Sequence, residues 1–111
     1  MTNEQLAALI GTGEADELQP ILWDKVRGFF ILLSNKYASQ HAGRCKQCGI
    51  TADDIRQESY FAMLDAIKAY CNRPAEQSDY KFISYCGFPF KSHAGALLGY
   101  KTNKQYHQAV S

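Results

Sequence analysis

The chain has 111 residues, enough for one domain with a modest hydrophobic core. Its apolar fraction of 46% is ordinary for a globular protein and excludes disorder as the default interpretation. The net charge is only +1, and the longest apolar run, Phe29–Leu33, is far too short to cross a membrane. Because the N-terminal residues also lack the basic and apolar regions of a signal peptide, we expect a cytoplasmic protein with no membrane association.

The first half of the chain is typical of two helices. Residues 3–10 form a short amphipathic segment, and Gly11–Gly13 should end it. Pro20 suits the first turn of a longer helix that extends to about residue 40. Residues 41–50 contain two glycines and are predicted to be a polar loop. The longer helix is predicted because apolar side chains recur three and four residues apart: Ile21, Leu22, Val26, Phe29, Phe30, Leu33 and Tyr37.

The second half predicts two further helices. Thr51 caps the first of them, and Asp54 stands at its third position in a variant of the capping box. Large and small side chains alternate on its inward side: Ile55, Ser59, Ala62, Met63, Ala66, Ile67 and Tyr70. The last helix is predicted over residues 80–98, and Gly87 with Pro89 should kink or break it. No segment alternates as a strand does, so we predict an all-α fold, a small bundle of about four helices.

The four cysteines permit more than one interpretation. Cys45 and Cys48 have the spacing of half a zinc site, and His41 lies four residues before Cys45. No second ligand pair has matching spacing, and Cys71 and Cys86 stand alone. Reduced thiols are therefore favoured over a metal site, and we expect no cofactor. If a metal binds, its ligands should be His41, Cys45 and Cys48.

The charges are distributed unevenly along the chain. Residues 1–24 carry five acidic side chains and no Lys or Arg, whereas residues 80–111 carry four lysines and no acidic residue. Such asymmetry suggests a polyanionic partner for the C-terminal part, although a solvated basic surface would look the same. The chain has no phosphate-binding glycine loop and no serine elbow, and capping accounts for Asp53 and Asp54. We therefore do not expect an enzyme.

An extended pattern gives the chain a specific resemblance. It begins with Asp54-Ile-Arg-Gln57-Glu58-Ser-Tyr-Phe, continues as Leu64-Asp-Ala-Ile-Lys-Ala-Tyr70, and ends with Lys81-Phe-Ile-Ser-Tyr85. In order, spacing and helical context this resembles region 2 of bacterial RNA polymerase sigma factors. The similarity covers residues 20–98, while residues 1–15 resemble the short acidic helix that often precedes that region. The resemblance implies one sigma region 2-like domain with a polar tail, 99–111.

The resemblance implies that the helix beginning at Thr51 docks on the clamp helices of the β′ subunit of core RNA polymerase. Asp54, Gln57, Glu58 and Phe61 are also spaced so that they share one helix face, which would suit recognition of another helix. An ordinary solvated helix face is the alternative. A family member could also bind an anti-sigma factor. The implied polymerase-binding residues are Asp54, Gln57, Glu58, Tyr60, Phe61 and Leu64.

The resemblance also implies contact with promoter DNA. Sigma factors flip a base of the non-template strand of the −10 element into an aromatic pocket, and Tyr70, Phe82 and Tyr85 match its positions. Lys81 and Lys91 would meet phosphates. The alternative for Phe82 and Tyr85 is that they are buried core aromatics.

The sequence departs from the family where two tryptophans commonly form a wedge. Phe88-Pro89-Phe90-Lys91 stands there, and Phe88 can still stack on a base. Ser92 and His93 fall near the positions that read the upstream base pair. The departure suggests a divergent or alternative sigma factor. The rival interpretation is a regulator that holds the clamp surface without melting DNA. Exposure of Tyr85, Phe88 and Lys91 together would favour DNA binding, and their burial would favour the regulator.

Overall fold

The computed structural model describes residues 1–100, and the predicted all-α fold is confirmed for them. They are 78% helical, contain no strand, and form five α-helices rather than about four. None of these helices is long and apolar enough to span a membrane. The end of the predicted tail, residues 101–111, lies outside the described part. The α-helices are α1 (Asn3–Ile10), α2 (Gln19–Gln40), α3 (Ala42–Cys48), α4 (Ala52–Cys71) and α5 (Gly87–Leu97), with single 3₁₀ turns at η1 (Asp16–Leu18), η2 (Ala75–Gln77) and η3 (Phe82–Tyr85).

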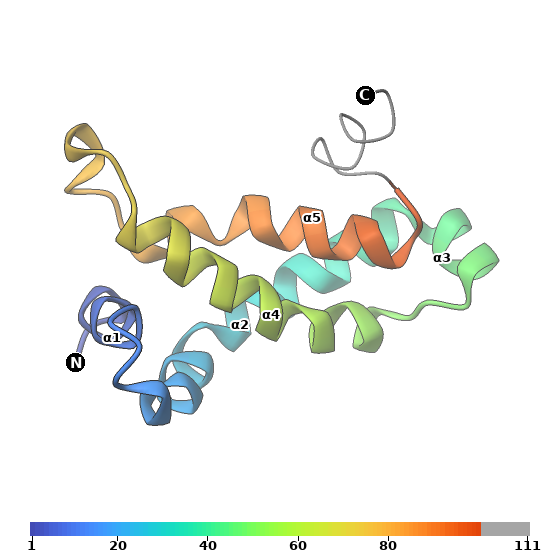
Figure 1. Ribbon diagram of the computed structural model, residues 1–111. Coiled ribbons are helices and arrows are strands. Elements are labelled where there is room, and N and C mark those ends of the chain that lie inside the picture. Colours follow the sequence, from blue (N-terminus) through green and yellow to red (C-terminus); the bar gives the residue numbers. More distant parts are fainter. Residues whose placement is uncertain (101–111) are drawn as a thin grey trace.

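Helix α4 is the centre of the bundle (Figure 1). It packs against α1, α2, α5 and η3, while α1 also contacts α2 and η3. Helix α3 lies at the end of the molecule opposite α1. Among the predicted apolar positions of α2, Ile21 is half exposed and the others face the core wholly or in part. The largest fully buried side chains of the core are Phe30, Phe82, Leu6, Leu22, Ile55, Met63, Leu98 and Val26.

The predicted inward side of α4 is buried in full. Ser59 on this side meets Ser34 of α2, with their hydroxyl oxygens 3.4 Å apart. Each hydroxyl is also bonded to a carbonyl of its own helix, Ser34 to Phe30 and Ser59 to Ile55. These small side chains satisfy their hydrogen bonds locally, so the two helices can pack there without an unpaired buried polar group.

The starts of the helices follow the sequence signals closely. Thr51 accepts a hydrogen bond from the Asp54 backbone N–H, and the Asp54 carboxylate accepts one from the Thr51 N–H at 2.8 Å. This reciprocal capping satisfies two N–H groups that the helix itself cannot pair. Pro20 lies in the first turn of α2, as predicted. Thr2 and Gln5 form a further capping box at α1.

The prediction of a polar loop at residues 41–50 is wrong, because Ala42–Cys48 forms α3. Buried Cys45 anchors the helix, and the Arg44 Nε donates to the Leu98 carbonyl at 2.7 Å. Gly49 ends it with φ of +67°, a left-handed conformation that glycine adopts without strain. The hydrogen bond between Arg44 and Leu98 joins residues 54 positions apart in the sequence, so no local pattern could have revealed it.

The predicted break near Gly87 and Pro89 is confirmed, but its position changes the role of the proline. The 3₁₀ turn η3 ends at Tyr85, and α5 begins at Gly87. Pro89 therefore lies in the first turn of α5, where backbone N–H groups have no partner within the helix. Pro89 is thus accommodated in the first turn of α5 and does not bend the helix.

Candidate functional site

The predicted polymerase-binding residues of α4 differ in how exposed their side chains are. Gln57 is exposed, and the Phe61 side chain is 53% exposed although it is large and apolar. Leu64 is partly buried and packs against the core. Asp54 is half-buried, and its carboxylate is already used in the cap of α4. Gln57 and Phe61 are therefore the members of this face most available to a partner.

Glu58 is bound to α5 through His93. The His93 Nδ1 lies 2.9 Å from a Glu58 carboxylate oxygen, and its Nε2 lies 2.6 Å from Asp65. One imidazole thus joins two carboxylates that stand two turns apart on α4. Both ring nitrogens are engaged, so in this structure His93 has none left for the predicted DNA contact.

The protonation of His93 is set by opposing influences. Burial lowers its pKa, while the hydrogen bonds and negative charges of Asp65 and Glu58 raise it, and the net result is a raised pKa. Protonation lets both ring nitrogens donate to a carboxylate at once. The bridge is therefore strongest when His93 is charged.

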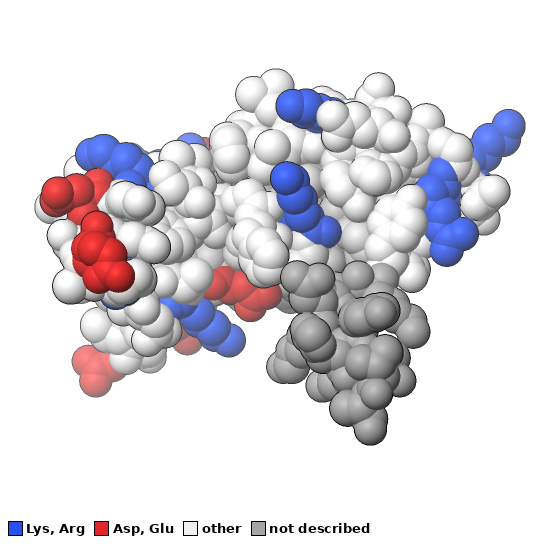
Figure 2. All heavy atoms as spheres, turned by 90° about the horizontal axis from the view of Figure 1, so that it is seen from above, with Lys and Arg blue, Asp and Glu red and all other residues white. Residues whose placement is uncertain are grey.

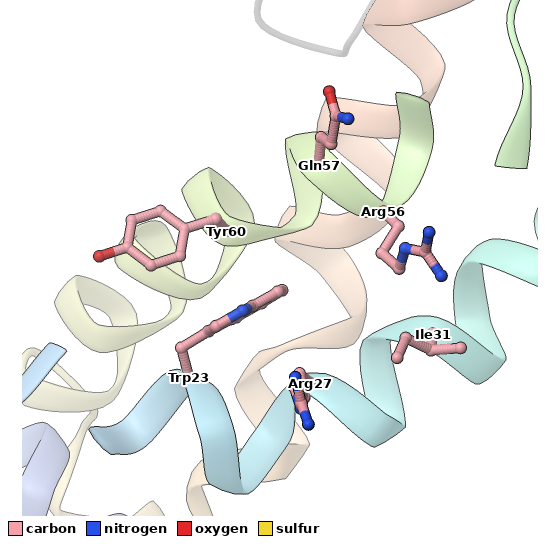
Figure 3. A pocket seen from close by; sticks show the side chains of 6 residues that line it. All are labelled: Trp23, Arg27, Ile31, Arg56, Gln57 and Tyr60. Atoms are coloured by element: carbon pink, nitrogen blue, oxygen red, sulfur yellow. The ribbon is translucent and has the colours of Figure 1, made fainter. Parts of the chain in front are cut away.

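Tyr60 lies on the side of α4 that faces α2, and it lines a groove of about 400 Å³ between the two helices (Figure 3). Its hydroxyl donates to the Gln19 side chain at 3.0 Å, and its ring packs edge-on against Trp23. The groove is lined by Trp23, Arg27 and Ile31 from α2 and by Arg56, Gln57 and Tyr60 from α4.

This groove is basic as well as aromatic. Arg56 pairs with Asp53 one turn earlier, whereas Arg27 projects from α2 at an exposed position. Trp23 and Arg27 were not among the predicted site residues, because the resemblance assigned polymerase binding to the helix after Thr51 only. The spacing of apolar residues in α2 indicates its buried stripe but not which of its flanking residues meets α4 across a groove.

The three predicted pocket aromatics lie together, as the resemblance implies, but they fill the space themselves. The Tyr70 ring stands edge-on to Phe82 at 5.9 Å and to Tyr85 at 5.7 Å between centroids. Phe82 has no exposed surface, and Tyr70 is 5% exposed. Tyr85 is half-buried and donates its hydroxyl to Gln77 at 2.7 Å. Tyr70 and Phe82 are therefore core residues here and offer no ring face to an extruded base.

Two residues absent from the predicted site hold this aromatic cluster. The Glu4 carboxylate of α1 accepts a hydrogen bond from the Phe82 backbone N–H at 2.8 Å, at the start of η3. The Arg73 guanidinium lies 4.0 Å from the centroid of the Tyr70 ring, within the range of a cation–π contact. The acidic N-terminal helix thus fixes the segment that carries Phe82.

The surface of α5 differs from this closed cluster. On α5, Phe88 is 76% exposed, Lys91 is exposed and Ser92 is half-buried. Lys81, which precedes η3, is also exposed. Figure 2 views the molecule from the α5 side and shows a mostly uncharged surface with separate Lys and Arg side chains. Acidic side chains gather mainly at the left end, where α1 and the 72–81 loop lie in Figure 1. Phe88 is therefore exposed on α5, whereas Phe82 of η3 is buried.

The CxxC pair belongs to α3. Cys45 is buried, Cys48 approaches the Leu98 carbonyl at 3.7 Å, and His41 stacks on Tyr37 with ring centroids 4.2 Å apart. Within residues 1–100, no group of three or more His, Cys, Asp and Glu side chains is close enough to hold a metal ion. The structure thus gives the hypothetical ligands His41, Cys45 and Cys48 contacts of their own within the fold.

Comparisons of the chain with known protein families, with curated proteins and with solved structures found no significant match. Any assignment of function therefore depends on the residues and their geometry.

Proposed function

We propose that this chain is a sigma factor domain that binds core RNA polymerase through the outer face of α4 and contacts promoter DNA through α5. The observation that carries the proposal is the pairing of exposed Gln57 with exposed Phe61 one turn later, on a helix whose opposite side is buried in the core. Aromatic residues, Phe among them, are enriched in protein interfaces relative to the rest of the surface. The partner would be the clamp helices of the β′ subunit, and the site of action would be the cytoplasm.

The DNA part of the proposal is supported by the open surface of α5. Two of the three residues that distinguish DNA binding from its rival, Phe88 and Lys91, are exposed, and Tyr85 is half-buried. A base could stack on Phe88, and Lys91 stands one turn further along the same helix for a phosphate. Promoter contact would then begin on the outside of α5.

The burial of Tyr70 and Phe82 favours a second candidate function. A chain whose aromatic cluster stays closed could hold the clamp surface and never melt DNA. Such a protein would act as a regulator or decoy of the polymerase. It would bind core polymerase as tightly with promoter DNA as without it.

The docking proposal is tested by titrating core RNA polymerase with the Gln57→Ala/Glu58→Ala chain. Because Glu58 also bridges to His93, its substitution disturbs the α4–α5 contact. The matched control is His93→Ala, which breaks the same bridge and leaves the outer face of α4 intact. We expect the double variant to lose on the order of tenfold in affinity, the size of a moderate interface residue, and the control to lose little. Equal binding by the double variant and the wild type would refute docking through this face.

A further inference from the structure

A second groove lies between α2 and α5, and of the residues that line it the resemblance implicates Lys91 alone. Its volume is about 360 Å³, at the lower end of the range of ligand sites. Helix α2 contributes the residues between Leu33 and Gln40 that face the groove, and α5 contributes residues from its N-terminal half. The lining residues are Leu33, Lys36, Tyr37, Gln40, Gly87, Phe90 and Lys91.

The lining has the composition of a site for a nucleotide. Two residues of the lining are charged at neutral pH, Lys36 on α2 and Lys91 on α5, and both are exposed. No carboxylate lines the groove, so no lining residue balances the positive charge of the two lysines. An anion between the two helices would meet one ammonium group from each side.

The inner wall of the groove is aromatic. Tyr37 packs edge-on against buried Phe90 with centroids 5.9 Å apart, and its other neighbour, His41, stacks on it at 4.2 Å. Burial raises the pKa of Tyr37, so its hydroxyl stays protonated and able to donate a hydrogen bond. Gly87 adds no side chain, which leaves the α5 rim open to a planar group.

The exposed part of α5 lies next to the groove, although Phe88 does not line it. Phe88 follows Gly87 directly, and Lys91 lies three residues after Phe88, so these two side chains are neighbours on the helix surface. A strand whose phosphate met Lys91 could place one base in the groove and stack the next on Phe88. Interleaved lysines and aromatics are what single-stranded DNA requires, because its bases are free to stack.

We infer that the α2–α5 groove is a binding site for single-stranded DNA, with Lys36 and Lys91 meeting phosphates. The partly exposed ring of Tyr37, backed by buried Phe90, forms the wall against which a base packs. This inference takes its ligand class from the proposed function and deepens it. It moves the contact away from the closed Tyr70–Phe82 cluster. Lys36, Tyr37 and Gln40 become DNA-binding residues that the motif did not contain.

The test is a fluorescence anisotropy titration of the chain with labelled oligo-dT over a salt series. Lys36→Ala should reduce the dependence of log K on log salt by about 0.7 and weaken binding roughly fivefold at 0.1 M salt, as expected for one lost phosphate contact. Lys36→Ala/Lys91→Ala should reduce the slope by about 1.4. The control is Lys68→Ala, which removes an exposed lysine from α4 and should leave binding near that of the wild type.

Ultraviolet crosslinking to the same oligonucleotide gives a readout that does not depend on charge. Adducts should appear in the peptide that contains Tyr37 or in the one that contains Phe88 and Phe90. Unchanged binding by Lys36→Ala, an equal loss with Lys68→Ala, or adducts confined to residues 70–85 would each overturn the inference. Binding of Lys36→Ala to core polymerase should equal that of the wild type, so failure of the groove and failure of polymerase docking can be told apart.

Discussion

The sigma-like pattern includes both the outer face of α4 and the aromatic cluster of Tyr70, Phe82 and Tyr85, but the two differ in exposure. On α4, Gln57 and Phe61 are exposed over a buried inner side. In the cluster, Phe82 is fully buried and packed edge-on against Tyr70. A motif can therefore preserve the position of a residue while the surrounding packing decides whether that residue is available to a ligand.

The largest effect should come from truncating the closed cluster. Phe82→Ala removes a fully buried aromatic side chain and should lower the free energy of unfolding by about 3–5 kcal/mol. Thermal or urea denaturation followed by circular dichroism measures this loss. Phe88→Ala, at a 76% exposed site, is the control and should stay within about 0.5 kcal/mol of the wild type. If Phe82→Ala were as stable as Phe88→Ala, the cluster would not be part of the core.

The next effect should appear on the open face of α4. Phe61→Ala should reduce affinity for core RNA polymerase on the order of tenfold, because it removes the exposed aromatic from the proposed interface. Stability should hardly change. Leu32→Ala is a matched control, since Leu32 is another apolar side chain exposed on a helix, at 71%. A titration in which both variants bind alike would exclude Phe61 from the interface.

A smaller effect should distinguish the open surface of α5 from the closed cluster. Phe88→Ala should weaken binding of single-stranded DNA by about 1 kcal/mol, the lower end of the contribution of one stacked base. Tyr85→Phe keeps the ring, loses only the hydrogen bond to Gln77, and should bind as the wild type does. Anisotropy measurements on both variants check this. A greater loss of affinity for Tyr85→Phe than for Phe88→Ala would indicate that the DNA contacts the aromatic cluster.

The smallest effect concerns the bridge between the two helices and depends on pH. The folded-state pKa of His93 is raised above the usual 6.5, so its stabilisation is fully present below about pH 6.5 and is lost as the pH rises through the raised value. Relative to His93→Gln, the wild type should be more stable at pH 5.5 by up to roughly 1 kcal/mol, the upper range for partly exposed ion pairs. Denaturation of both proteins across this pH range measures the difference, which should shrink at alkaline pH. A difference that grew as the pH rose would contradict the bridge.

The parts of the fold that could be predicted are those whose signals are local. Thr51 and Asp54 cap α4 through contacts three residues apart, and the period of its apolar side chains determines the buried side. In contrast, the hydrogen bond from Arg44 to Leu98 joins α3 to the end of α5, and the hydrogen bond from the Phe82 N–H to Glu4 joins η3 to α1. Neither long-range contact leaves a periodic trace in the sequence.

The same difference holds for the candidate site. The residues of the outer face of α4 could be predicted from the spacing within that one helix. The contact between Glu58 and His93 of α5 could not be predicted in this way. Both grooves lie between helices, so their α2 residues, Arg27 and Lys36, become visible only after the bundle is assembled. The chemistry of a residue type is readable from the sequence, whereas its exposure depends on packing.

The central claim, that α4 docks on core RNA polymerase and α5 then meets promoter DNA, is tested most directly by one binding measurement. The labelled chain is titrated with core polymerase, alone and with a promoter fragment whose −10 non-template strand is single-stranded. We predict binding to core alone and a clear gain in affinity when the fragment is present. Absence of binding to core polymerase in both titrations would contradict the account, and binding that ignores the fragment would favour the regulator.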